Sequence, residues 1–237
     1  MTEKTVTASK PQGKKITART IASVAMFCAI AYVVMLLSKL IPISVSGFLT
    51  PDFKDMVVVI AGFILGPLAS LFISVFVSVL EMLTWSTTGP IGMLMNILST
   101  CAFALPATIV YKHRHKFSNA VLGLVFGVVM MTVMMLIWNY LVTPLYMGVS
   151  REVVTGMLVP VFLPFNLLKG CINAALTILL YKPVINALRA ARLIPSHEKT
   201  GGEIKTGKRQ LGVVILSLLI LVACVLLLLI LSGIIVL

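Results

Sequence analysis

The chain has 237 residues, of which 59% are hydrophobic and only 11% are charged. A soluble domain carries roughly a quarter charged residues, so this chain has too few to cover a water-exposed surface. Several apolar runs also exceed the ~20 residues that cross a bilayer, and the run 211–237 contains no charged residue. The composition predicts a polytopic protein of the lipid bilayer. It excludes a soluble enzyme, a nucleic-acid-binding domain and a disordered protein.

The predicted elements, taken in chain order, are apolar helices separated by turns rich in proline and glycine. A basic tail over residues 1–17, which we expect to be disordered, precedes the first helix, and breakers such as Gly66-Pro67 mark helix ends. Seven helices are expected, over about residues 20–40, 53–65, 68–85, 91–111, 119–143, 158–180 and 211–237, with loops at 41–51 and 144–156. The fold class is an all-α polytopic membrane helix bundle. It comprises a six-helix domain (18–190), a basic cytoplasmic linker (191–210) and an appended seventh transmembrane helix (211–237).

The formal net charge of +12 indicates topology rather than a nucleic-acid partner, because no basic stripe is interleaved with exposed aromatic residues. Fifteen of the 19 lysines and arginines lie in residues 1–19, 112–116 and 182–210. These segments share one side of the membrane if the seven helices alternate in direction, and the side rich in Lys and Arg is the cytoplasmic one. We therefore expect a cytoplasmic N-terminus.

Ionisable residues inside two predicted helices mark a candidate site, because a charge at the bilayer centre costs at least ~2.5–3.5 kcal/mol. These residues are Glu81 and Lys169, and Lys169 shares one helical face with Asn166 and Asn173. By the predicted topology, five polar residues of the outer half of the membrane converge on one outward-facing cavity: Glu81, Asn96, Asn139, Asn166 and Lys169. Amides suit a neutral polar ligand. The alternatives are amides that join helices to each other and an internal Lys169–Glu81 ion pair.

The segment Asp52-Phe53-Lys54-Asp55 opens the second predicted helix on the outer side. One interpretation is a solvated loop in which Asp52 or Asp55 caps the helix N-terminus, and the other is a lid over the cavity. Aromatic residues near the outer interface are typical of a membrane belt, although two or three together would also enclose a flat ring: Trp85, Trp138, Tyr140 and Tyr146.

Small residues repeat along the first helix at Ala18, Ala22, Ala25 and Ala29. Such spacing lets another helix approach closely, either within this bundle or in another membrane subunit. The four cysteines lie in apolar runs without the spacing of a metal site, so we expect no metal. The chain also lacks the sequence motifs for nucleotide hydrolysis and for the common hydrolases.

Three groups of residues carry a resemblance to a known family. They are Asp52-Phe53-Lys54-Asp55 leading into Gly62-Phe63-Ile64-Leu65-Gly66-Pro67, Asn139-Tyr140-Leu141 with Pro144-Leu145-Tyr146, and Pro164-Phe165-Asn166-Leu167-Leu168-Lys169-Gly170. On these motifs, residues 18–190 resemble the substrate-binding (S) components of energy-coupling-factor (ECF) vitamin transporters, and the riboflavin-specific branch in particular. The appended helix 211–237 departs from that family, whose core has six helices.

The resemblance implies a bacterial plasma-membrane protein that is not an enzyme and needs no cofactor. Such a protein binds riboflavin from outside, and an ECF transmembrane subunit with two ABC-type ATPases drives uptake. The residues expected to bind the substrate are Glu81, Asn96, Asn139, Asn166, Lys169, Tyr146 and Asp55, and those expected to dock on the transmembrane subunit are Ala22, Ala25 and Ala29. The alternatives are the same fold with another vitamin, a proton-coupled carrier, and an intramembrane enzyme that uses Glu81 and Lys169 as acid and base.

Overall fold

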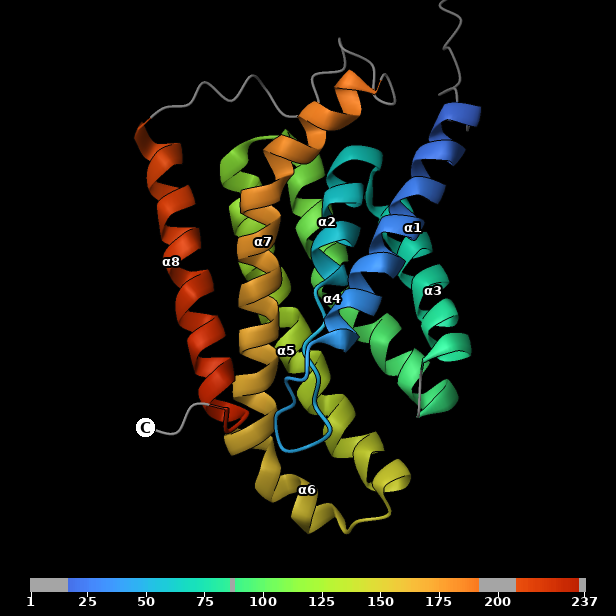
Figure 1. Ribbon diagram of the computed structural model, residues 1–237, viewed down its shortest axis with the longest axis vertical. Helices are drawn as coiled ribbons and strands as arrows, with labels where there is room; N and C mark the ends of the chain where they lie inside the picture. The colour runs from blue at the N-terminus through green and yellow to red at the C-terminus, as the bar shows by residue number, and fades with distance from the viewer. Residues whose placement is uncertain (1–16, 86–87, 192–207, 235–237) are drawn as a thin grey trace, which may run out of the picture.

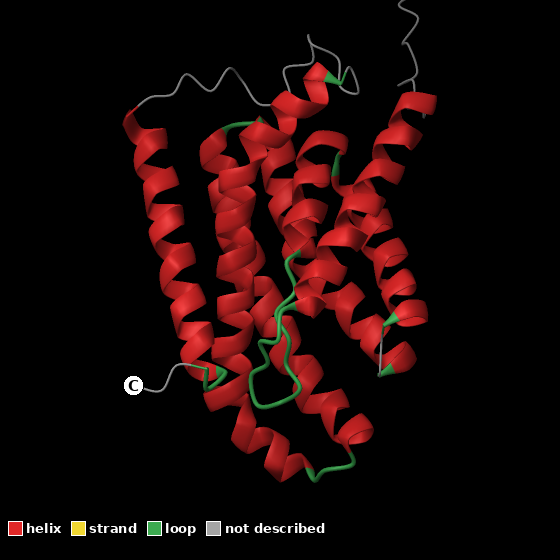
Figure 2. Cartoon of the chain, in the orientation of Figure 1, coloured by secondary structure: helices red, strands yellow, loops and turns green. Residues whose placement is uncertain are grey.

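The computed structural model describes residues 17–85, 88–191 and 208–234, which form an all-α bundle (Figures 1 and 2). Its helices are α1 (Ala18–Leu40), α2 (Lys54–Leu65), α3 (Pro67–Thr84), α4 (Gly89–Arg114), α5 (Phe117–Met147), α6 (Arg151–Met157), α7 (Leu163–Ala190) and α8 (Lys208–Leu231). A π-helical turn, Leu158–Phe162, joins α6 to α7. The expected disorder of the tail and most of the predicted linker fall outside the described residues.

Six helical segments are long and apolar enough to cross a membrane: α1, α3, α4, α5, the continuous segment Arg151–Ala190, and α8. With 12 residues, α2 is shorter than the ~20 that a bilayer requires. The polytopic helical bundle expected from the composition is thus confirmed.

The predicted loop over 144–156 is wrong, because most of it is helical. Helix α5 continues through Pro144 to Met147 and ends at Gly148, whose φ of +64° places it in the left-handed region that terminates many helices. A proline near a helix end removes only one backbone hydrogen bond, so the helix continues for another turn. Helix α6 then follows after a gap of three residues. Helix α7 likewise passes through Pro183 and runs ten residues beyond its predicted end.

The helices run alternately up and down the bundle (Figure 1). One end holds the start of α1, the α2–α3 turn, the α4–α5 connection and the end of α7. The other end holds α6, the end of α8 and residues 41–53, which we call the outer loop. This loop returns into the bundle, so that α2 begins near the middle of its height (Figure 1). The charged start of α2 is therefore carried into the interior.

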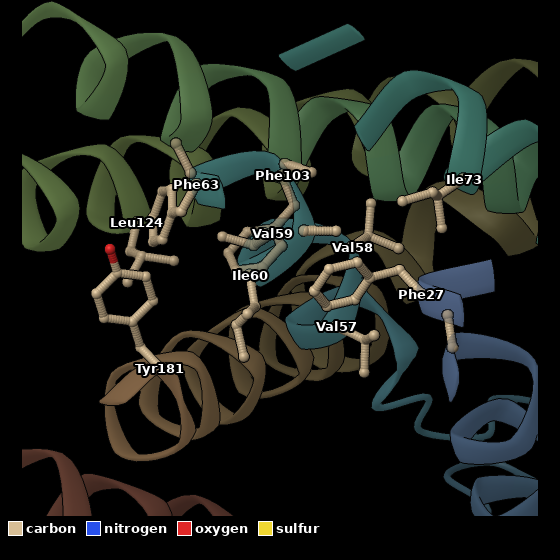
Figure 3. Close-up of a cluster of buried hydrophobic side chains, with 14 of the residues drawn as sticks. Phe27, Val57, Val58, Val59, Ile60, Phe63, Ile73, Phe103, Leu124 and Tyr181 are labelled. Carbon is tan, nitrogen blue, oxygen red and sulfur yellow. The ribbon is translucent and has the colours of Figure 1, made fainter. Parts of the chain in front are cut away.

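Helix α2 is the centre of the core, and it packs against α1, α3, α4 and α7. Nine of its 12 residues are buried, as expected for a helix that is apolar all round. Figure 3 shows Val57 to Ile60 of α2 between Phe27 of α1, Ile73 of α3 and Phe103 of α4. This packing fixes the position of the first turn of α2, where the polar residues gather.

Two glycines bring α4 and α5 into close contact. A Cβ atom at Gly123 or Gly127 would collide with the backbone carbonyl of Ala107 or Phe103. Small residues four apart allow such an approach between membrane helices. The α4–α5 pair is therefore a tightly packed wall of the bundle beside α2 and α7.

Candidate ligand-binding site

The outer loop and the first turn of α2 bring three charged side chains into the interior. Lys54 and Asp55 have no exposed surface, and Asp52 is 4% exposed. The carboxylate of Asp52 accepts a hydrogen bond from the backbone N–H of Lys54 at 2.9 Å, which satisfies one of the free N–H groups at a helix start. Asp52 thus caps the helix from outside its N-cap residue, Phe53. The interpretation of this segment as a solvated loop is wrong.

Lys54 and Lys39 together hold Glu81. The Lys54 ammonium contacts the Asp52 carboxylate and lies 3.0 Å from Glu81 Oε2. Lys39, in the last turn of α1, lies 3.2 Å from Glu81 Oε1 and donates to Thr50 Oγ1 of the outer loop at 3.4 Å. Glu81 therefore links α3 to α1, to α2 and, through the lysines, to the outer loop.

Lys169 of α7 pairs with Asp55 rather than with Glu81. Its Nζ lies 3.4 Å from Asp55 Oδ2 and donates to Ser99 Oγ at 3.3 Å. The other carboxylate oxygen of Asp55, Oδ1, accepts a hydrogen bond from Thr100 Oγ1 at 2.6 Å. The alternative of an internal Lys169–Glu81 pair is therefore wrong, although Lys169 does take part in an internal ion pair.

We call the six ionisable groups the charge cluster: Lys39, Asp52, Lys54, Asp55, Glu81 and Lys169. Three ammonium groups face three carboxylates, so the cluster carries no formal net charge when all six are ionised. Buried charges are tolerated when they are paired and hydrogen-bonded. The residues come from α1, the outer loop, α2, α3 and α7, so the cluster joins most of the bundle at one point. Such a site suits a polar ligand without net charge.

Asn173 attaches α7 to the start of α2. Its Nδ2 donates to the carbonyl of Asp52 at 2.9 Å, and its Oδ1 accepts from the Met56 N–H at 3.0 Å. Asn173 thus serves the structural role that the sequence analysis held open for amides inside the membrane. It also fixes the carbonyl of the loop residue that pairs with Lys54.

Of the seven residues predicted to bind a substrate, three meet in the charge cluster: Asp55, Glu81 and Lys169. Asn139 and Asn166 are buried, and each donates to a carbonyl of its own helical segment, Asn139 to Met135 at 2.7 Å and Asn166 to Phe162 at 2.8 Å. Asn96 and Tyr146 are half-buried.

The π-helical turn ends at Phe162, one helical turn before Asn166. Phe162, whose carbonyl accepts the Asn166 hydrogen bond, also makes an edge-to-face ring contact with Phe48 of the outer loop, with ring centroids 6.0 Å apart. π-Helical turns are rare and frequent at functional sites. The outer loop thus contacts the π-helical turn at Phe162 and α7 at Asn173.

Sequence reasoning missed three members of the charge cluster, Lys39, Asp52 and Lys54, and two of its hydrogen-bond partners, Ser99 and Thr100. Lys39 stands near a helix end, where lysines usually reach out to water, and the serine and threonine occur in an ordinary apolar run. The available indication was the density of charge around Lys54. Two acids and a lysine within four residues are unusual beside a helix without other charges.

The alanine face of α1 points away from the bundle. Ala22, Ala25 and Ala29 are exposed, whereas Phe27, Ala31 and Met35 face the core. Packing of these three alanines inside the bundle, one of the two predicted alternatives, is therefore wrong. The face is open to lipid or to another membrane protein.

Comparisons with known proteins agree with this architecture. Residues 19–181 match the family described as "ECF transporter, substrate-specific component". The chain is 31% identical over 182 residues to the riboflavin transporter FmnP of Bacillus subtilis, covering 72% of this chain and 95% of that relative. It is 29% identical over 173 residues to the riboflavin transporter RibU of Staphylococcus aureus, covering 70% and 90%.

A solved structure, described as "Structure and mechanism of the S component of a bacterial ECF transporter", is also similar. The TM-score is 0.61 at 30% identity, and the match covers 71% of this chain and 96% of the other. Two thirds of the chain thus share both sequence and fold with S components. The chain belongs to the family of substrate-specific components of ECF transporters, and it is a multi-pass membrane protein of a transport system rather than an enzyme.

Proposed function

We propose that this chain binds riboflavin from outside a bacterial plasma membrane and delivers it with an ECF transmembrane subunit and two ABC-type ATPases. The observation that carries the proposal is the charge cluster, a neutral set of paired charges, five of the six buried, inside a bundle of predominantly apolar helices. Two relatives named riboflavin transporters, at 29% and 31% identity, support the choice of ligand.

The topology that we propose counts α2 and the outer loop as one crossing. The chain then crosses the membrane seven times, six times in the S-component domain (18–190) and once as α8. The basic residues Arg19, Lys112, Arg114 and Arg189 lie at the bundle end opposite the outer loop (Figure 1), which the preference for positive charge inside makes cytoplasmic. The outer loop then faces the exterior, and the N-terminus is cytoplasmic.

Lys169 and Asp55 are the groups of the cluster best suited to accept a ligand. The contacts of Lys169, at 3.3 and 3.4 Å, are longer than the ~2.7–2.9 Å of strong charge-assisted hydrogen bonds. Asp55 Oδ2 is buried and accepts no hydrogen bond of good geometry. A flavin offers carbonyl oxygens to Lys169 and an imide N–H or ribityl hydroxyls to Asp55. The ligand would thus complete bonds that the protein alone leaves weak.

The other proposed contacts of the substrate are Glu81, Asn96, Asn139, Asn166 and Tyr146. Asn139 and Asn166 each donate one amide hydrogen to a backbone carbonyl of their own helical segment. A side-chain amide has a second hydrogen, which is left to donate to a ligand. These side chains come from α3, α4, α5 and α7. A ligand held by all of them would bridge the halves of the bundle.

The exposed alanine face of α1 is the surface that we propose for docking on the transmembrane subunit. Replacing both Ala25 and Ala29 with Leu should block close approach of the partner helix and abolish copurification with that subunit, while riboflavin binding stays intact. Copurification of the double variant at the wild-type yield would contradict this assignment.

The experiment that tests the function is a titration of the purified, ligand-free chain with riboflavin. Flavin fluorescence should be quenched with an end point of about one riboflavin per protein, and thiamine and biotin should not compete. A folded preparation that quenches nothing would refute riboflavin binding. Competition by thiamine or biotin at equal concentration would instead indicate another vitamin for the same fold.

A further inference from the structure

Helix α8 lies beyond the part of the chain that the family explains. The family match ends at residue 181, and the alignments that cover 90% and 95% of two relatives account for 70% and 72% of this chain. Figure 1 shows α8 alongside α7 at the edge of the bundle, on the side away from α1. It therefore leaves the alanine face of α1 open.

One face of α8 packs along α7, which is its neighbour in the bundle. The side chains on this face recur at spacings of four, three and four residues: Ser217, Leu221, Cys224 and Leu228. This is the spacing of two long helices that pack side by side. Leu228 is 2% exposed, whereas its neighbour Leu227 is 50% exposed. Helix α8 is thus a packed part of the bundle and not only an anchor in lipid.

The α7–α8 contact reaches the charge cluster through the outer loop. Cys224 and Leu228 of α8 form a hydrophobic cluster with Leu168 and Ile172 of α7, and Phe53 of the outer loop packs against the same cluster. Leu168 directly precedes Lys169, and Ile172 directly precedes Asn173. Ile43, near the start of the outer loop, also packs there.

Phe53 connects this hydrophobic cluster to the charged groups. It stands between Asp52 and Lys54 in the sequence, and its backbone N–H donates to Ser38 Oγ at 3.2 Å. A shift of Phe53 would displace the carboxylate of Asp52 and the ammonium of Lys54 with it. The apolar contact and the ion pairs therefore restrain the same short segment from opposite sides.

We infer that α8 is a positioning element of the ligand site. It holds α7 against Phe53 and so fixes residues 52–55 in the arrangement that receives the ligand. The part of this inference that concerns the ligand rests on the proposed function. Helices in a membrane associate through close packing rather than through the hydrophobic effect, so a void in this contact loosens it directly. Loss of the contact should shorten the residence time of the ligand without removing any group that touches it.

The test compares Leu228→Ala with Leu227→Ala in the full chain. Leu228→Ala should raise the riboflavin dissociation rate by about tenfold, which corresponds to ~1.4 kcal/mol, and should speed amide hydrogen exchange in residues 49–56 of the ligand-free protein. Leu227→Ala, a lipid-facing change of the same size, should do neither. Leu228→Met, a separate variant that keeps most of the side-chain volume, should have the wild-type dissociation rate.

A merely structural role predicts a different result. If Leu228→Ala lowers the melting temperature but leaves both the exchange in residues 49–56 and the dissociation rate unchanged, the inference is overturned. Should that variant fail to fold, Leu221→Ala, which truncates the half-buried residue two turns earlier, gives the same comparison. If the wild-type chain binds no riboflavin, the proposed function fails, and the exchange measurement still decides whether α8 positions the segment.

Discussion

The two ends of α2 are stabilised in opposite ways. At its start, Lys54 and Asp55 take part in the charge cluster. At its end, the ring of Phe63 lies 4.5 Å from that of Tyr111 and 5.7 Å from that of Tyr181, measured between centroids. The two tyrosine hydroxyls are 2.6 Å apart and hydrogen-bonded to each other. One buried helix thus has an ionic end and an aromatic end.

Under the proposed function, the ionic end of α2 binds the ligand and the aromatic end supports the fold. Apolar contacts are non-directional, and a set of packed rings tolerates small changes. An ion pair in the interior depends on both partners, because removal of one leaves an uncompensated buried charge. The ionic end can also exchange its internal contacts for contacts with a ligand, whereas the aromatic end has no weak bond to give up. The variants below are ordered from the largest expected effect to the smallest.

Lys54→Met should have the largest effect on stability. It removes the only cation in contact with Asp52 among the ion pairs of the described residues, and one of two that hold Glu81. Breaking a buried pair in this way costs ~3–5 kcal/mol of unfolding free energy. Denaturant unfolding of the ligand-free protein in detergent measures the loss.

Two further variants serve as controls for Lys54→Met. Lys112→Met removes an exposed lysine from the opposite end of the bundle and should change the stability very little. Adding Asp52→Asn to Lys54→Met should recover part of the loss, because the uncompensated carboxylate is then gone. If Lys54→Met costs no more than Lys112→Met, the ionic end of α2 is not held by its charges.

Lys169→Met should weaken riboflavin binding more than it weakens the fold. A lost hydrogen bond to a charged group costs ~1.5–3 kcal/mol, so the dissociation constant should rise by about 12- to 160-fold at 1.4 kcal/mol per decade. The variant also leaves Asp55 without its ammonium partner, which lowers stability. Fluorescence titration measures the affinity.

The double variant Lys169→Met with Asp55→Asn separates the two effects. It restores the charge balance of the cluster, so the stability should return while the affinity stays low. If the double variant binds riboflavin as tightly as the wild-type chain does, Lys169 and Asp55 are a structural pair, and their assignment as ligand contacts is wrong.

Much of the fold, but only part of this site, was predictable from the sequence. The helices followed from apolar runs separated by proline and glycine, and Glu81 and Lys169 were identified because charge is costly in such runs. For Lys54 and Asp55 the sequence left two interpretations open, a solvated cap of the helix and a lid over the cavity, and the family resemblance implied that Asp55 binds the substrate. Their burial depends on the return of the outer loop into the bundle, which is a tertiary feature that no local pattern encodes.

The pairing of Lys169 could not be read from the sequence for a related reason. Glu81 and Lys169 were the two conspicuous charges inside helices, so their mutual pairing was the simplest alternative. In the structure Glu81 is already occupied by two lysines, and Asp55 on α2 faces α7. Local rules are expected to fail at functional sites, and two of the missed members of the charge cluster, Asp52 and Lys54, lie where the outer loop returns into the bundle.

Tyr181→Phe tests the aromatic end of α2 with a smaller effect. The change removes one hydroxyl and leaves that of Tyr111 without its partner, while the ring contact with Phe63 remains. The expected loss of unfolding free energy is ~0.5–1.5 kcal/mol. Riboflavin affinity should stay at the wild-type value, because the site lies at the other end of α2. A drop in affinity as large as that of Lys169→Met would mean that the two ends do not act separately.

Ser78→Ala should have the smallest effect, with the opposite sign. Ser78 has no exposed surface, and its hydroxyl has no hydrogen-bond partner among the described residues, whereas the buried hydroxyl of Ser70 on the same helix donates to the Val58 carbonyl at 3.0 Å. An unsatisfied buried hydroxyl costs ~1–3 kcal/mol, so its removal should leave the ligand-free protein as stable or raise its unfolding free energy by up to ~1 kcal/mol. Ser70→Ala, the matched control, should destabilise the protein by ~0.5–1.5 kcal/mol.

Because Ser78 lies one turn before Glu81, the riboflavin affinity of Ser78→Ala decides between two roles of this serine. If the affinity is unchanged, the Ser78 hydroxyl is only an unsatisfied buried group beside the ionic end. If the affinity falls while the stability rises, the Ser78 hydroxyl is a hydrogen-bond partner of the bound ligand.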